Sequence, residues 1–241
     1  MKWYRQKPTV FLSGKTSSSG SLSLNRERES AGEKMAGEPG IPKSVTDQIR
    51  EICRQIDETQ EPYFVPVRPE PDSQIEECFF NVKTKVEKDG GRIQFGWALW
   101  KWPHVMVWAD FHAIWISPEG ERIDVTPVPS FDRMLFLPDS TQEYDYARSY
   151  YRVPLKYFPI SDNPVVLEYI ALKQELFNIE EEHSPGQDLC LEGPALNRWQ
   201  EVKQKIVQVG LQLASQSQPM HSKTRRKPPH LLTKFKKYRG R

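Results

Sequence analysis

Two neighbouring runs of residues, 92–102 and 105–116, constrain the fold most, because apolar side chains occupy both of their alternating faces. In the first run, one face carries Phe95, Trp97 and Leu99 and the other carries Ala98, Trp100 and Trp102. The second run repeats the pattern. A strand that is apolar on both sides is typical of the centre of a sheet, so we predict two central antiparallel strands.

The turn after the second run fixes the register of the next strand, predicted over 122–126. Pro118 suits the first central position of a type I turn, and Gly120 suits the left-handed residue that closes a three-residue hairpin loop. With that loop, Asp124 lies diagonally beside His112 on the same face of the sheet. A four-residue loop would put the two side chains on opposite faces, so the turn chemistry favours contact between imidazole and carboxylate.

Helical spacing of apolar residues predicts four helices around this sheet. The second of them opens at Ser73, with Glu76 three residues later as in a capping box, and ends at Gly90-Gly91. Cys78 is then expected in its second turn. The other three helices are predicted over 45–59 after the N-cap Ser44, over 164–181 after the N-cap Asn163, and over about 195–214. An extended segment is predicted over 61–71, and the runs 131–137 and 150–158 are expected to be either short strands or covering loops.

A cysteine on a helix followed by a histidine and an aspartate on strands has the order of a thiol hydrolase. Cys78 would attack a carbonyl, His112 would take and return the proton, and Asp124 would hold the imidazole in one tautomer. Asp110 lies on the same strand face as His112 and is an alternative to Asp124. The side chain of Asn81, one turn from Cys78, is a candidate oxyanion donor. The alternative reading of Cys78 and His112 is that both are ordinary core residues.

Length and charge bound the organisation of the chain. Its 241 residues suggest one α+β domain over 43–215, between a disordered segment at 1–42 and a basic disordered tail at 216–241. From Lys223 to Arg241 there are nine Lys or Arg and no acid, so the net charge of +2 leaves the remaining residues at 2 − 9 = −7. Residues 221–241 could contact nucleic acid or an acidic partner, or simply be solvated. Met35 is an alternative start.

The three cysteines suggest a reducing compartment. Cys53, Cys78 and Cys190 cannot all pair with one another and show no CxxC spacing, so we expect no metal and no cofactor. The longest apolar run near the amino terminus, Val10–Leu12, is too short for a signal peptide or a membrane span. We therefore expect a cytoplasmic protein without a membrane segment, whose oligomeric state the sequence leaves open.

Several short motifs carry a resemblance to known proteins. They are Glu77-Cys78-Phe79-Phe80-Asn81-Val82, Gly96-Trp97-Ala98-Leu99-Trp100, Phe111-His112-Ala113-Ile114-Trp115 and Asp124-Val125-Thr126-Pro127. Together they resemble a group of uncharacterised bacterial and phage proteins. The order of Cys, His and Asp is also similar to the papain-like and transglutaminase-like superfamily, whose members cleave or exchange amide bonds through a thioester. This resemblance implies that Cys78 is the nucleophile, His112 the base and Asp124 the orienting group.

The sequence therefore predicts a Cys-bearing helix packed on a small antiparallel sheet, with flanking helices and disordered termini. The expected function is thiol-dependent hydrolysis or transfer at an amide or related acyl bond, with a peptide or another acyl compound as substrate. The alternative function is a non-catalytic binding module whose basic tail contacts nucleic acid or an acidic partner.

Overall fold

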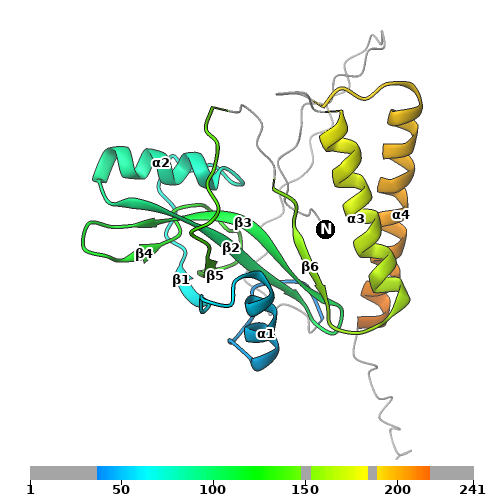
Figure 1. Cartoon of the computed structure of the whole chain (residues 1–241), viewed down its shortest axis with the longest axis horizontal. Coiled ribbons are helices and arrows are strands. Elements are labelled where there is room, and N and C mark those ends of the chain that lie inside the picture. Colours follow the sequence, from blue (N-terminus) through cyan, green and yellow to red (C-terminus); the bar gives the residue numbers. More distant parts are fainter. Residues whose placement is uncertain (1–36, 148–152, 184–188, 218–241) are drawn as a thin grey trace, which may run out of the picture.

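The computed structural model describes residues 37–147, 153–183 and 189–217 of the chain. Over these ranges the fold is α+β, with a six-stranded antiparallel sheet and four helices (Figure 1). The elements in chain order are α1 (Asp47–Ile56), β1 (Tyr63–Pro66), α2 (Cys78–Asp89), β2 (Arg92–Trp102), β3 (Met106–Ile116), β4 (Arg122–Ile123), β5 (Arg133–Pro138), β6 (Lys156–Pro159), α3 (Pro164–Glu182) and α4 (Gly193–Ser217).

The two predicted central strands are confirmed as β2 and β3, which pair along their whole length from Arg92↔Ile116 to Trp102↔Met106. The sheet is larger than the one predicted from residues 92–126. Its strand order is β1-β5-β2-β3-β4, and β6 also pairs with β3. Asp124 joins the two outer strands of this order, β1 and β4. Its N–H donates to the Pro66 carbonyl at 3.0 Å and its carbonyl accepts from the Arg68 N–H at 2.8 Å. The sheet thereby curls until β1 meets the end of β4.

The edge of β3 that faces away from β2 is split between two partners. β6 pairs with Met106–Ala109, and β4 pairs with Trp115–Ile116. Between them, no strand in the described ranges pairs with residues 110–114 on that edge. β4 is also shorter than the predicted 122–126 strand, because after Ile123 the main chain turns its hydrogen bonds to β1. The candidate site lies beside residues 110–114 of β3.

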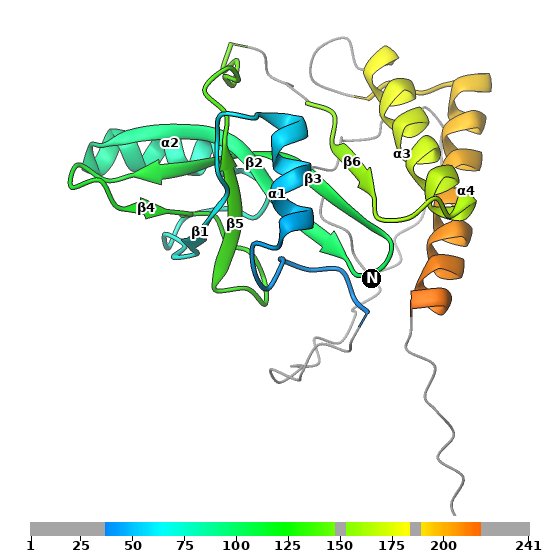
Figure 2. The same cartoon turned by 60° about the horizontal axis from the view of Figure 1, so that its bottom comes forward.

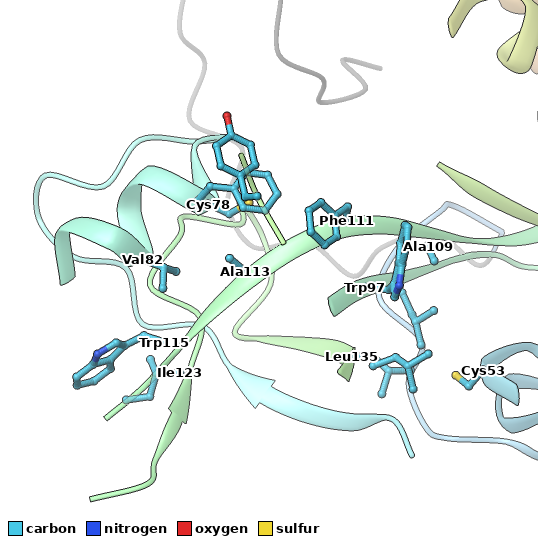
Figure 3. Close-up of a cluster of buried hydrophobic side chains, with 14 of the residues drawn as sticks. Cys53, Cys78, Val82, Trp97, Ala109, Phe111, Ala113, Trp115, Ile123 and Leu135 are labelled. Carbon is cyan, nitrogen blue, oxygen red and sulfur yellow. The ribbon is translucent and has the colours of Figure 1, made fainter. Parts of the chain in front are cut away.

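Two apolar clusters hold the helices to the sheet. The larger contains Val82 of α2 and Cys53 of α1 together with the face of β2 and β3 that includes Trp97 and Phe111 (Figure 3). The second joins α3 and α4 to Trp102 at the β2–β3 turn. Accordingly, α2 lies at one end of the molecule and the α3–α4 pair at the other (Figures 1 and 2). No helix within the described ranges combines the length and apolar character needed to cross a membrane.

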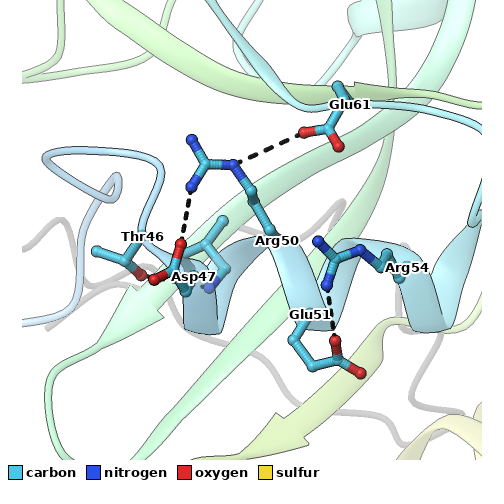
Figure 4. Close-up of polar contacts among 7 residues, drawn as sticks. Thr46, Asp47, Arg50, Glu51, Arg54 and Glu61 are labelled. Atoms are coloured by element: carbon cyan, nitrogen blue, oxygen red, sulfur yellow. Dashed lines mark hydrogen bonds and ion pairs between the residues drawn. The ribbon is translucent and has the colours of Figure 1, made fainter.

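The first helix, α1, is shorter than predicted at both ends. Its N-cap is Thr46 rather than Ser44, and the Thr46 hydroxyl accepts a hydrogen bond from the Ile49 N–H at 3.3 Å. Arg50 lies between Asp47 and Glu61, so ion pairs join the first turn to the segment that follows the helix (Figure 4). The helix ends at Ile56, because Asp57 adopts an extended conformation. The prediction of residues 45–59 was therefore wrong at its boundaries.

The remaining boundaries differ by a few residues from those expected. Asn163 caps α3 as predicted, its side chain accepting from the Val165 N–H at 2.9 Å. At the amino-terminal end, Gly40 exchanges two backbone hydrogen bonds with Lys101, so the folded part begins before the predicted boundary at residue 43. Some predictions concern residues outside the described ranges. These are Met35 and the rest of the predicted disordered segment up to residue 36, residues 150–152 of the 150–158 segment, and the basic tail at 221–241.

Candidate thiol site

Cys78 is the first residue of α2, not a residue of its second turn as the sequence suggested. The expected start at Ser73 fails because Gln74 is held in another conformation. Its N–H donates to the Asn81 Oδ1 at 3.0 Å, and its carbonyl accepts from the Asn81 Nδ2 at 2.7 Å. Glu76 then has a positive φ of 70°, which an α-helix cannot contain. The helix therefore begins only after this turn, with the thiol at its tip.

The position at the helix start has an electrostatic consequence. The first N–H of α2 that donates to a preceding carbonyl is that of Asn81, which reaches Glu77 at 2.9 Å. The N–H groups at the start of a helix point out of its end, and with the helix dipole they favour negative charge there. Cys78 is only 6% exposed. Figure 3 shows it at the start of α2, above the strand that carries Phe111 and Ala113.

The predicted contact between imidazole and carboxylate is confirmed, with His112 Nε2 lying 2.9 Å from Asp124 Oδ2. The predicted turn produces it. Gly120 has a φ of 91° and its N–H donates to the Ser117 carbonyl, while Trp115 pairs with Ile123. This is the register that a three-residue loop gives. The second carboxylate oxygen, Asp124 Oδ1, accepts from the Thr126 N–H at 2.9 Å, which fixes the plane of the group.

The His112 ring lies against the Asp124 carboxylate, with the Cys78 sulfur close enough to influence its charge. Burial alone would lower the pKa of the imidazole, but the Asp124 carboxylate and the Cys78 sulfur raise that pKa well above its usual value of 6.5. Because Nε2 is used by Asp124, Nδ1 is the ring nitrogen left for the sulfur. Imidazole and carboxylate thus form one pair near the thiol, with the carboxylate fully buried and the ring 12% exposed.

Asn81, the predicted oxyanion donor, is used elsewhere. Its two amide hydrogens go to the Gln74 carbonyl at 2.7 Å and to Thr126 Oγ1 at 3.2 Å, so neither is directed at a substrate. The predicted role of Asn81 as oxyanion donor is therefore wrong. Asn81 instead ties the start of α2 to Thr126, whose N–H is held by Asp124. The sequence could not reveal this role, because the bond joins residues 45 positions apart.

A cavity of about 190 Å³ opens beside the sulfur and the ring. Its walls come from the start of α2, from residues 110–112 of β3, from β2 and from the segment 126–129. Val153 and Leu155, just before β6, complete it. Cys78 and His112 both line this cavity. The thiol is therefore buried by its neighbours and still borders a space that a ligand can enter.

The other candidates separate clearly in the structure. Asp110, the alternative orienting group, is exposed and lines the same cavity, whereas Asp124 makes the contact with His112. Cys53 is buried in the core, where burial and the nearby Glu61 raise the pKa of its thiol to about 12. Cys190 is exposed. Among the described residues, no three His, Cys, Asp or Glu side chains cluster as metal ligands would.

No known family model, curated protein or solved structure matches this chain. The resemblance to papain-like and transglutaminase-like proteins that the sequence suggests therefore depends only on the order and spacing of Cys78, His112 and Asp124.

Proposed function

We propose that this protein is a thiol-dependent hydrolase or acyltransferase that acts on an amide or related acyl bond. One observation carries the proposal: His112 Nε2 lies 2.9 Å from the Asp124 carboxylate, and the same ring lines one cavity together with Cys78. The ring is therefore held by an acid and borders the same cavity as a thiol at a helix start. A reducing compartment such as the cytoplasm would keep that thiol free.

In this mechanism, His112 removes the proton from the Cys78 thiol through Nδ1 while Nε2–H stays bonded to Asp124. The thiolate sulfur then forms a bond to the substrate carbonyl carbon, and the carbonyl oxygen becomes negatively charged. The imidazolium returns its proton to the leaving amine as the carbon–nitrogen bond breaks, which leaves a thioester on Cys78. Attack by water completes a hydrolysis, and attack by a second amine completes a transfer.

The start of α2 supports the charge that develops on the carbonyl oxygen. Main-chain N–H groups of the first turn point out of the helix end, close to the sulfur that attacks. Donors of this kind are effective because they are already oriented before the reaction begins. They take the place of the Asn81 amide in the proposal.

Selective alkylation of the Cys78 sulfur tests this function. In a full-length Cys190→Ser background, iodoacetamide at pH 7 should label Cys78 at least about tenfold faster than Cys53, whose thiol pKa is near 12. His112→Ala should remove most of this difference. The anionic reagent iodoacetate adds a second readout: its rate relative to iodoacetamide should fall as the pH rises through the pKa of His112, because the imidazolium attracts it.

The control is Cys78→Ala, in which labelling by both reagents should fall to the slow rate of Cys53. If Cys78 reacts only in denaturant, or if His112→Ala leaves its native rate unchanged in a folded protein, the sulfur and the ring do not act together. The proposed function would then be abandoned.

A further inference from the structure

The cavity beside Cys78 is mainly apolar. Eleven of its sixteen lining residues have apolar side chains, and none is Lys or Arg. Trp100 and Met134 come from the sheet and Leu155 from the segment before β6, so the walls belong to three separate parts of the chain. Transfer of an apolar group from water into a cavity of this composition is therefore favourable.

The size of the cavity fits more than a small acyl group. One water needs roughly 10–15 Å³ of such space, so about 190 Å³ corresponds to about a dozen non-hydrogen atoms. An acetyl group would leave most of this volume empty. A large side chain together with part of its main chain would fill it.

Charge selects further among ligands of that size. Away from the His112 ring, the two acids on the wall, Glu76 and Asp110, disfavour a carboxylate on the ligand side chain. A charged ligand group would also have to leave water for a largely hydrocarbon surface. A neutral apolar side chain meets neither penalty.

The sheet beside the cavity suits the main chain of a peptide. Phe111 and His112 line the cavity and belong to the part of β3 that no described strand pairs with on its outer edge. Extended peptides commonly bind at such an edge, where main-chain groups provide affinity and alternate side chains enter pockets.

On these grounds we infer that the substrate is a peptide with a large neutral apolar side chain on the residue that donates the acyl group. This inference depends on the proposed function and narrows it to one class of acyl donor. The apolar side chain occupies the cavity, and its carbonyl carbon lies over the Cys78 sulfur.

A series of N-acetyl aminoacyl chloromethyl ketones tests the inference on the full chain carrying Cys190→Ser. In each reagent the thiolate forms a sulfur–carbon bond and chloride leaves, so only the side chain varies. Each labelling rate is divided by the rate of the same reagent with glutathione. The Leu and Phe reagents should label Cys78 at least about tenfold faster than the Ala reagent, and faster still than the Asp reagent.

A change in the cavity wall should alter this preference. Ala98 is 2% exposed and lines the cavity, so Ala98→Val should lower the ratio of the Phe rate to the Ala rate severalfold. The matched control is Ala171→Val on the exposed side of α3, which should keep the original ratio.

Two failures can be told apart. Equal rates across the series, or a preference for Asp, would overturn the inference about the acyl donor while His112-dependent labelling by iodoacetamide upheld the thiol chemistry. Loss of that iodoacetamide reaction would overturn the proposed function, and the inference with it.

Discussion

The His112 ring is ionisable although its side chain is only 12% exposed, and the Asp124 carboxylate raises the pKa of the ring. Because the His112 pKa in the folded protein is raised above 6.5, the charged ring stabilises the fold fully below pH 6.5. That contribution is lost as the pH rises through the folded value. The same titration removes the proton that the proposed mechanism gives to the leaving group.

Replacing Asp124 by Asn should lower the pKa of His112. The amide keeps the shape of the side chain but removes the buried negative charge that favours the imidazolium. NMR titration of the His112 ring would measure the change, and the iodoacetate-to-iodoacetamide ratio should fall at a lower pH than in the unsubstituted protein. Asp110→Asn is the control, since Asp110 is exposed. If both variants moved the pKa equally, Asp124 would not be the orienting group.

At the residue level, the sequence predicted the His112–Asp124 contact because turn chemistry is local: Pro118 and Gly120 determine the register whatever lies around them. The role of Asn81 depends on a contact with Thr126 that only the folded chain brings about. Nothing in the residues around Asn81 distinguishes a catalytic amide from a structural one.

Among the elements, α2 shows how a side chain can override a capping signal. Ser73 and Glu76 have the spacing of a capping box, yet the Asn81 carboxamide binds both main-chain groups of Gln74 and prevents a helical turn there. The long runs that became β2 and β3 were predictable because an alternating apolar pattern over eleven residues has few other solutions. The two-residue β4 was not, since its shortness depends on the pairing of Asp124 with β1.

The turn between β2 and β3 offers a test of stored strain. The Val105 N–H donates to the Trp102 carbonyl at 3.0 Å, and His104 has a φ of 63°, a conformation that glycine adopts more readily. His104→Gly should therefore raise the free energy of unfolding by about 0.5–1 kcal/mol, despite the greater freedom of glycine in the unfolded chain. Urea denaturation measures this. His104→Ala, which keeps the strain, should give no such gain; equal effects would show that the backbone is relaxed.

Across the whole molecule, the two apolar clusters share no buried side chain, and α2 packs in one while α3 and α4 pack in the other. Val82 in α2 and Val202 in α4 are both fully buried, one in each cluster. We expect Val82→Ala and Val202→Ala each to cost about 2 kcal/mol of unfolding free energy, from lost transfer energy and the space left behind. The double variant should cost the sum to within about 0.5 kcal/mol, because the sites are distant. A clear departure from the sum in urea denaturation would mean that the clusters are coupled through the sheet.

The α+β class followed from the alternation of strand-like and helix-like periods, whereas the curled shape of the sheet did not. Its closure depends on the main chain of Asp124, and main-chain hydrogen bonds leave no mark on the choice of side chain.

That closure makes Asp124 serve two purposes at once. Its side chain orients the ring, and its amide and carbonyl join the ends of the sheet. Any local opening that separated β1 from β4 would therefore also move the Asp124 carboxylate away from His112 and lower the reactivity of Cys78. The amide protons of Arg68, Asp124 and Thr126 should then exchange with deuterium together, at the rate at which the reactivity of Cys78 is lost.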